Sequence, residues 1–333
     1  MTYLMSVILG FVQGVAEFLP ISSSGHLTLF QHFFGMEEPD NLFNVLLHFA
    51  TLLAVCIYYF RDVVEMVAEF LPISSSGHLT LFQHFFGMEE PDNLFNVLLH
   101  FATLLAVCLY YFRDVTEMIA EFFRAVASLV SRKRRGGEIP EARRMVLLVI
   151  VGTLPLFAVL LIKDYVEALG ASPIFVSCAL LITGCILFLS DRMAGGRKTA
   201  RNATLKDVLL VGVAQGLATI PGLSRSGSTI SAGMAVGFER KFAVRYSFLM
   251  SLPAVLGATI LEVKDVLELE GGLAAGLLPK YLLGMAVAGV VGYFSIRLVN
   301  LLAAKGKFGA FAYYCWAAGV ISLILCFMGW TLI

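Results

Sequence analysis

Residues 10–26 read GFVQGVAEFLPISSSGH, and this stretch decides the fold. An apolar segment runs into a break of proline, serine and glycine, and a second apolar segment follows. Proline and glycine interrupt a helix and leave backbone polar groups without helical partners. At membrane depth such groups are tolerated only inside protein or beside a polar cavity. The stretch therefore predicts a re-entrant helical hairpin, which enters the membrane and returns to the same side.

A related stretch, GVAQGLATIPGLSRSGS, occupies residues 212–228. Seven positions are identical at a constant offset of 202 residues: Gly10, Gln13, Gly14, Ala16, Ser22, Ser24 and Gly25 match Gly212, Gln215, Gly216, Ala218, Ser224, Ser226 and Gly227. The second stretch has the same order of apolar segment, break and apolar segment, so it predicts a second hairpin. Two broken helices in corresponding halves of a chain are typical of an inverted-topology repeat. We predict residues 10–144 as the first half and 207–333 as the second.

The composition is that of a membrane protein. Hydrophobic residues make up 59% of the 333 residues and charged residues only 14%, whereas soluble domains carry about 25% charge. About 20 apolar residues cross the hydrocarbon core as a helix. Candidate spans are 43–60, 95–112, 145–163, 174–190, 246–262, 280–303 and 309–331. We therefore predict an all-α, polytopic transmembrane helical bundle with two re-entrant hairpins, forming a single membrane domain over residues 1–333.

Charged residues gather in loops and predict the orientation. One basic cluster comprises Arg132, Lys133, Arg134, Arg135, Arg143 and Arg144, and another comprises Arg192, Arg197, Lys198, Arg201 and Lys206. The positive-inside rule places both clusters in the cytoplasm. The acidic stretches 36–42 and 262–271 are then outside, so the two hairpins enter from opposite faces. The net charge is zero and offers no case for nucleic-acid binding. The six cysteines lie in apolar segments, and we expect them to be small buried hydrophobes.

Residues 16–67 and 68–119 are the same 52-residue block in tandem. The copies differ only at Ile57/Leu109, Val64/Thr116 and Val67/Ile119. Such near-identity indicates a recent duplication and not an old structural repeat. Two arrangements remain open. Either 43–64 and 70–87 form the first hairpin and 1–36 an additional one, or 1–36 keeps the hairpin and 65–88 crosses the membrane once.

The first motif carries candidate metal ligands. Gln13 and Glu17 are four residues apart, so their side-chain oxygens share one helix face. In the second copy Glu65 and Glu69 have the same spacing. Mg²⁺ is commonly held by one or two carboxylates together with substrate phosphates. We therefore expect a divalent cation here, most simply Mg²⁺, with Ca²⁺ as the other candidate.

Serines and a histidine follow each acidic pair. They are Ser22, Ser23, Ser24 and His26 in the first copy, and Ser74, Ser75, Ser76 and His78 in the second. Serines at a break before a helix present amides and hydroxyls to an anion. A histidine beside them predicts a nucleophile or an acid–base group.

Arg225 is the most informative residue of the second motif. An arginine in a break within the membrane requires an anionic partner, and its planar fork suits phosphate. Ser224, Ser226 and Thr229 add hydroxyl groups, and Gly222 allows close backbone approach. The pattern predicts a phosphate-binding site that contains Arg225.

Two segments carry a family resemblance. QGVAEFLPISSSGH (13–26) and PGLSRSGST (221–229) resemble the two motifs of the undecaprenyl-pyrophosphate phosphatase family of the bacitracin-resistance type. The resemblance implies hydrolysis of undecaprenyl pyrophosphate to undecaprenyl phosphate and inorganic phosphate, which recycles the lipid carrier for cell-wall synthesis. It also implies a multi-pass protein of the bacterial cytoplasmic (inner) membrane, with a polyprenyl pyrophosphate as substrate and membrane lipid around it. The nucleophile stays open between Ser23, His26 and metal-bound water, or Ser75 and His78 in the second copy.

Three questions remain open at this level. Only one copy can pair with the single 221–229 motif, and the first copy, which keeps the original upstream helix, is slightly preferred. The family accepts Glu or Gln at the first acidic position, so both copies are chemically complete. The rival function is a lipid-carrier flippase or anion transporter, because inverted repeats with broken helices are common in transporters. A homodimer is the assembly left open.

Overall fold

A computed structural model describes residues 71–86, 93–130, 139–159, 172–193, 195–268 and 278–328, with a few isolated residues elsewhere. The chain divides into two compact units, Met1–Val63 and Val64–Ile333. The described stretches all belong to the second unit. The motif at 10–26 and the candidate span 43–60 lie outside the described residues, as do Glu65 and Glu69.

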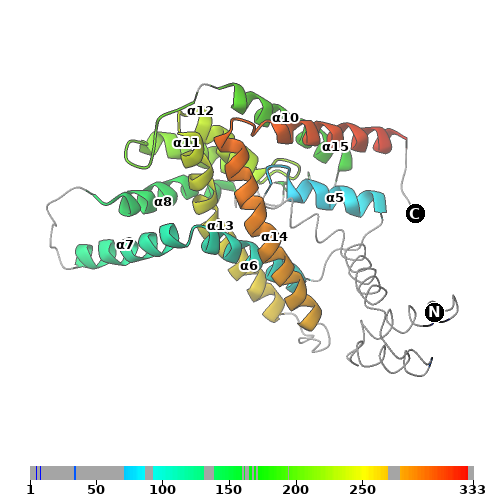
Figure 1. Ribbon diagram of the computed structural model, residues 1–333, viewed down its shortest axis with the longest axis horizontal. Coiled ribbons are helices and arrows are strands. Elements are labelled where there is room, and N and C mark those ends of the chain that lie inside the picture. The colour runs from blue at the N-terminus through cyan, green and yellow to red at the C-terminus, as the bar shows by residue number, and fades with distance from the viewer. Residues whose placement is uncertain are drawn as a thin grey trace. The chain divides into compact units, whose positions relative to one another are not determined.

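The described part of the chain is helical (Figure 1). Its helices are α5 (Ser75–Phe86), α6 (Asn93–Tyr110), α7 (Phe112–Val130), α8 (Glu141–Val159), α10 (Pro173–Arg192), α11 (Leu205–Leu217), α12 (Arg225–Ala235), α13 (Arg240–Glu268), α14 (Leu278–Ala304) and α15 (Ala310–Phe327). Within these stretches the only β-type contact is an isolated bridge between Lys198 and Phe238. The predicted all-α class is therefore confirmed.

Three of the described helices, α8, α10 and α15, are long and apolar enough to cross a membrane. Together with α6, α13 and α14 they coincide with the predicted spans from 95–112 onward. Helix α7 was not predicted as a span, and it carries charged residues such as Asp114 and Glu121. Apolar side chains that would be costly in water are exposed on the outer faces of α8, α10 and α15, as at Phe157, Ile182 and Ile324. The chain is a membrane protein.

Helices α11 and α12 form a helix–turn–helix unit and are both short. Helix α11 has 13 residues and α12 has 11, fewer than the roughly 20 that a span requires. Thr204 begins α11 with a reciprocal capping box to Asp207, and Ser224 caps the start of α12. The intervening turn contains Gly222, whose φ of +95° lies in the left-handed region that favours glycine.

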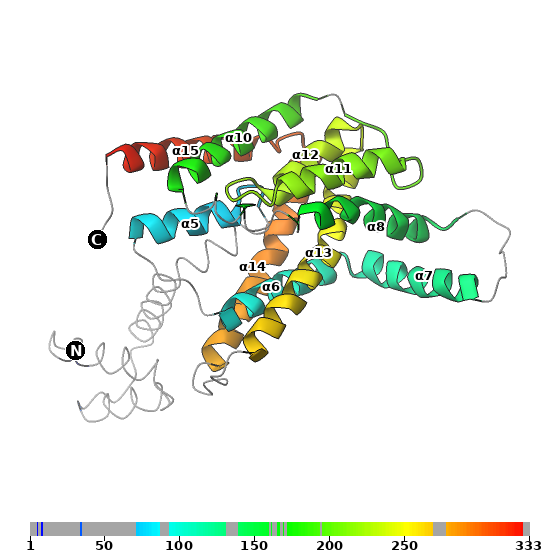
Figure 2. The same ribbon diagram turned by 180° about the vertical axis from the view of Figure 1, so that it is seen from behind.

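Two packing relationships position the site (Figures 1 and 2). Helix α8 packs against α11 and α13, and the small residues Gly152 and Gly212 let the α8 and α11 backbones touch. Helix α10 packs against α15, α12 and α5. Helix α10 therefore brings α5, which starts inside the second copy of the motif, next to α12.

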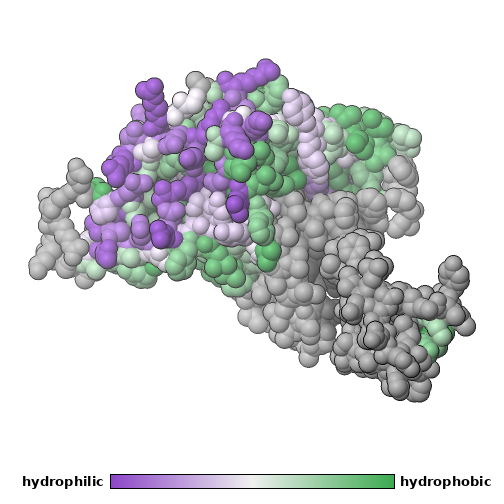
Figure 3. Space-filling model, viewed as in Figure 1, coloured by the Kyte–Doolittle hydropathy of each residue, from purple (hydrophilic) through white to green (hydrophobic). Residues whose placement is uncertain are grey.

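Polar side chains gather at one end of the described helices (Figure 3). Arg201 forms an ion pair with Glu141 at 3.1 Å, and the guanidinium of Arg144 donates to the Ala203 carbonyl at 2.9 Å. Arg143 pairs with Glu121 at 3.1 Å. Arg143 and Arg144 of the first basic cluster and Arg201 of the second therefore lie near the start of α8; the predicted cytoplasmic side of both clusters stays a prediction.

The cysteines only partly follow the prediction. Cys315 is buried, but Cys178 and Cys185 are exposed on α10. The expectation that all would be buried is wrong for these two. A small apolar side chain on a lipid-facing helix surface carries no penalty, so an apolar segment does not reveal which of its faces is covered.

Candidate functional site

The second copy of the first motif and the Arg225 motif fold alike. A turn precedes each helix, at 71–73 and within 218–223, and the helices start at Ser75 and Arg225. The hydroxyl of Ser74 accepts from the Gly77 amide at 3.2 Å, and that of Ser224 accepts from the Gly227 amide at 3.1 Å. Each serine provides an acceptor for an amide in the first helical turn, but the backbones differ, because φ is +65° at Ser74 and −76° at Ser224. The sequence similarity between the halves thus extends to this serine–amide hydrogen bond.

The two motifs are in contact. A β-carbon built on Gly77 would lie 3.0 Å from the Cα atom of Gly222. The Ser226 hydroxyl donates to the Leu71 carbonyl at 3.5 Å. The second copy therefore makes the described contacts with the Arg225 motif. The slight preference for the first copy finds no support in them, because Gln13, Glu17, Ser22, Ser23, Ser24 and His26 lie outside the described residues.

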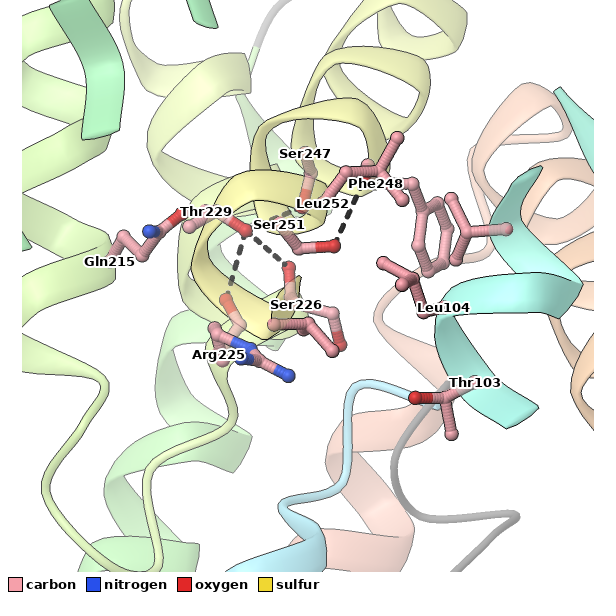
Figure 4. A pocket seen from close by; sticks show the side chains of 12 residues that line it. Thr103, Leu104, Gln215, Arg225, Ser226, Thr229, Ser247, Phe248, Ser251 and Leu252 are labelled. Atoms are coloured by element: carbon pink, nitrogen blue, oxygen red, sulfur yellow. Dashed lines mark hydrogen bonds between the residues drawn. The ribbon is translucent and has the colours of Figure 1, made fainter. Parts of the chain in front are cut away.

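A pocket opens beside the start of α12 (Figure 4). Its polar lining comes from four helices: Thr103 of α6, Gln215 of α11, Arg225, Ser226 and Thr229 of α12, and Ser247 and Ser251 of α13. Its apolar lining is Leu104, Val107, Phe248, Leu252 and Val255. Three residues predicted for the site, Arg225, Ser226 and Thr229, thus share one pocket. Arg225 is half-buried and is the first residue of α12.

Hydroxyl groups in the pocket bond to one another and to nearby carbonyls. Thr229 Oγ1 lies 2.9 Å from the Arg225 carbonyl and 3.2 Å from the Ser226 carbonyl. Its single proton is donated to these acceptors, so the Ser247 hydroxyl, at 2.5 Å, donates to Thr229. Ser251 donates to the Phe248 carbonyl at 2.8 Å. These bonds hold α12 against α13 and fix the wall next to Arg225.

Gln215 was not among the predicted site residues. It is 1% exposed, and neither its amide nitrogen nor its amide oxygen has a hydrogen-bond partner in the described part of the structure. The signal that could have identified it is the repeat itself, since Gln215 stands 202 residues after Gln13.

His78 is held by two contacts outside the pocket lining. Its Nδ1 atom lies 2.7 Å from the Ser74 carbonyl, and its Nε2 atom lies 2.7 Å from the hydroxyl of Tyr314 on α15. A carbonyl only accepts, so Nδ1 carries a proton, and in the neutral ring Nε2 accepts from Tyr314. The imidazole is 5% exposed and does not line the pocket.

The remaining predicted residues have mixed placements. Ser74 and Ser224 are buried caps, while Ser76 is exposed on α5. Gly222 packs closely on Ala179 and the Val176 carbonyl of α10. Ser75 is the first residue of α5, and its side chain is not among the described ones. Among described residues no group of three acidic, histidine or cysteine side chains forms a metal cluster. The predicted ligands Gln13, Glu17, Glu65 and Glu69 are all outside this part.

Comparison with known proteins identifies the relatives of the chain. An undecaprenyl-diphosphatase of Methanosphaera stadtmanae is 39% identical over 267 residues, covering 79% of this chain and 94% of the relative. One from Desulforapulum autotrophicum is 40% identical, covering 80% and 96%. One from Treponema denticola is 42% identical, covering 75% and 90%.

The sequence pattern of the family described as bacitracin resistance protein BacA matches this chain twice, over residues 6–68 and 63–321. The two matches divide close to the boundary between the duplicate blocks. The longer match contains the second copy of the first motif, the Arg225 motif and every described helix except the end of α15. The chain therefore belongs to the bacitracin resistance protein BacA family.

Proposed function

We propose that this chain is an undecaprenyl-diphosphatase, which hydrolyses undecaprenyl pyrophosphate to undecaprenyl phosphate and inorganic phosphate. The observation that carries the proposal is the pocket of Arg225, Ser226 and Thr229, with residues 71–78 packed against the same motif. The relatives named above bear this activity in their names, and they favour neither a flippase nor an anion transporter. The product would re-enter cell-wall synthesis as a lipid carrier.

The start of α12 suits a phosphate group. The first amides of a helix are directed outward, and the helix dipole favours negative charge at this end. Arg225 occupies the first position of α12 and adds a fixed positive charge with a planar fork. Phosphoryl transfer depends mainly on positioning and electrostatic stabilisation of the transferred group. Arg225 and the amides of α12 supply both.

A divalent cation, Mg²⁺ by preference, is part of the proposal. Glu65 and Glu69 would hold it in the second copy, as Gln13 and Glu17 would in the first. Glu69 stands two positions before Leu71 in the sequence, and the Leu71 carbonyl contacts Ser226 of the Arg225 motif. When bound, the cation would neutralise charge on the pyrophosphate oxygens.

The attacking group is Ser75, His78 or water. In each case a bond forms to the terminal phosphorus, and the bond from that phosphorus to the bridging oxygen breaks. Undecaprenyl phosphate leaves. If Ser75 or His78 attacks, water then attacks the same phosphorus, the bond from phosphorus to the side chain breaks, and inorganic phosphate leaves with the side chain restored. If water attacks directly, inorganic phosphate forms in the first step. His78 can reach the reacting atoms through Nε2 only after its bond to Tyr314 is released.

The membrane arrangement supports access for a lipid. We infer a multi-pass protein of the cytoplasmic membrane in which α11 and α12 form a re-entrant hairpin, because each is too short to cross. The inverted repeat pairs this hairpin with a second one that contains α5, which has 12 residues. The polyprenyl tail would remain in lipid while the head group enters the pocket.

Phosphate release by the purified chain tests the proposal. The chain in detergent with Mg²⁺ should release phosphate from undecaprenyl or farnesyl pyrophosphate, and Arg225→Ala should abolish release. Glu69→Ala and Glu17→Ala, made separately, should show which copy works, and we expect loss with Glu69→Ala only. Lipid movement across vesicles without any phosphate release would contradict the proposal.

A further inference from the structure

Most hydroxyl protons in the Arg225 pocket are already donated to acceptors of the protein. The hydroxyl protons of Thr229, Ser247 and Ser251 are donated to protein acceptors within the wall. Ser226 donates to the Leu71 carbonyl across the contact between the motifs. These hydroxyls therefore shape the pocket, and those of Thr229, Ser247 and Ser251 have little to donate to a bound anion.

Gln215 has unused donors in the same pocket. Its side chain extends from α11 toward α12, beside Thr229 (Figure 4), and Gln215 and Arg225 line the same pocket. The amide is buried, and both of its polar atoms lack a partner among the described residues. Removing a carboxamide from water without a replacement hydrogen bond is unfavourable. Buried polar groups without partners are rare enough that each one requires an explanation, such as a ligand.

We propose that Gln215 is a head-group-binding residue, whose Nε2 donates to a phosphate oxygen held by Arg225. The inference rests on the proposed function only for the identity of the molecule that carries the phosphate. A carboxamide is neutral, so it can donate without adding charge and can serve both the pyrophosphate and the inorganic phosphate product. Arg225 would supply the charge and Gln215 the directed hydrogen bond.

Phosphate-induced stabilisation tests this inference without turnover. A ligand that binds the folded protein raises its unfolding midpoint. Inorganic phosphate should therefore raise the thermal midpoint of the wild-type chain in detergent. Gln215→Leu should need about tenfold more phosphate for the same rise, the loss expected for one hydrogen bond. Gln215→Glu should weaken the effect further, because a carboxylate repels phosphate.

The thermal midpoint measured without phosphate separates ligand binding from a structural role. Without phosphate, Gln215→Leu should be at least as stable as the wild type, because it removes a buried amide that has no partner. Ser231→Ala is the matched control. Ser231 lies in α12, is 5% exposed and has a hydroxyl without a partner in the described structure, but it does not line the pocket. This variant should keep the wild-type response to phosphate.

The outcomes distinguish this inference from the proposed function. A Gln215→Leu chain that is less stable without phosphate, yet keeps the full phosphate response, would show that the amide is structural and overturn the inference. In the hydrolysis assay we expect KM to rise about tenfold and kcat to change little. If the wild type released no phosphate but showed Gln215-dependent phosphate binding, the inference would stand and the hydrolase proposal would fail.

Discussion

Gly77 and Gly222 face each other so closely that a β-carbon on Gly77 would lie 3.0 Å from the Cα atom of Gly222. The β-carbon on Gly77 would also lie 3.1 Å from the hydroxyl oxygen of Ser74. One glycine belongs to the second copy of the first motif and the other to the Arg225 motif. Their contact joins the two halves of the candidate site.

This contact predicts the effect of an added methyl group. Gly77→Ala should push the two motifs apart and lower phosphate release at least about tenfold, because a small displacement at a phosphoryl-transfer site is costly. Gly25→Ala is the matched control, since Gly25 is the same position in the first copy. It should leave the activity near the wild-type value. Equal loss in both variants would contradict a working site built by the second copy.

Arg225 should not be replaceable by lysine. Lysine keeps the charge but loses the planar fork that binds two phosphate oxygens together. We expect Arg225→Lys to lower kcat/KM for farnesyl pyrophosphate by roughly 30-fold or more, equivalent to about 2 kcal/mol. A lysine variant with wild-type kcat/KM would show that charge alone is needed.

We expect Tyr314 to affect kcat through its hydrogen bond to His78. Tyr314→Phe removes the hydroxyl that contacts His78 Nε2 and leaves the pocket lining unchanged. If His78 takes part in the reaction, kcat should change severalfold while KM stays constant. Tyr313→Phe, on the adjacent residue whose ring packs on Trp316, is the control and should leave both constants alone.

A double variant sharpens this test. Tyr314→Phe made in the His78→Ala background should have no further effect, because residues that act through each other are not additive. Independent effects of the two changes would show that Tyr314 does not act through His78.

The start of α11 should contribute a pH-dependent stability. Burial raises the pKa of the Asp207 carboxyl, but hydrogen bonds from Lys198 and Thr204 more than offset this and place the pKa below its usual value. A depressed carboxyl pKa stabilises the fold at pH values above the unfolded pKa of about 3.9. The contribution is lost as the pH falls through the folded value.

Asp207→Asn should therefore lower the thermal midpoint in detergent at pH 7. The difference from the wild type should begin to shrink as the pH falls below about 4, where the carboxyl of the unfolded chain becomes protonated, and should vanish once the folded carboxyl is protonated at still lower pH. Lys206→Gln is the control, because it removes a neighbouring charge that makes no such bond in the described structure. A difference that stays constant down to low pH would contradict the assignment.

Local rules were enough to predict much of the molecule from its sequence. The serine caps at Ser74 and Ser224 follow from serine before a helix, which depends only on nearby backbone. The apolar segments of α8, α10 and α15 indicate spans by length alone. Arg225 stood out because an arginine in a membrane break needs an anion. The repeat predicted that the two motifs would share a local fold.

Only the tertiary structure decided which distant residues meet. Gln215 matters because α11 packs against α12 and buries this amide, and nothing in the residues around it reveals that the amide is left without a partner in the described structure. His78 contacts Tyr314 across 236 positions of chain. The two copies of the first motif are the same in sequence at Gly25 and Gly77, so their residues could not show which one meets Gly222. That depends on helix packing over long range, because α10 holds α5 and α12 together.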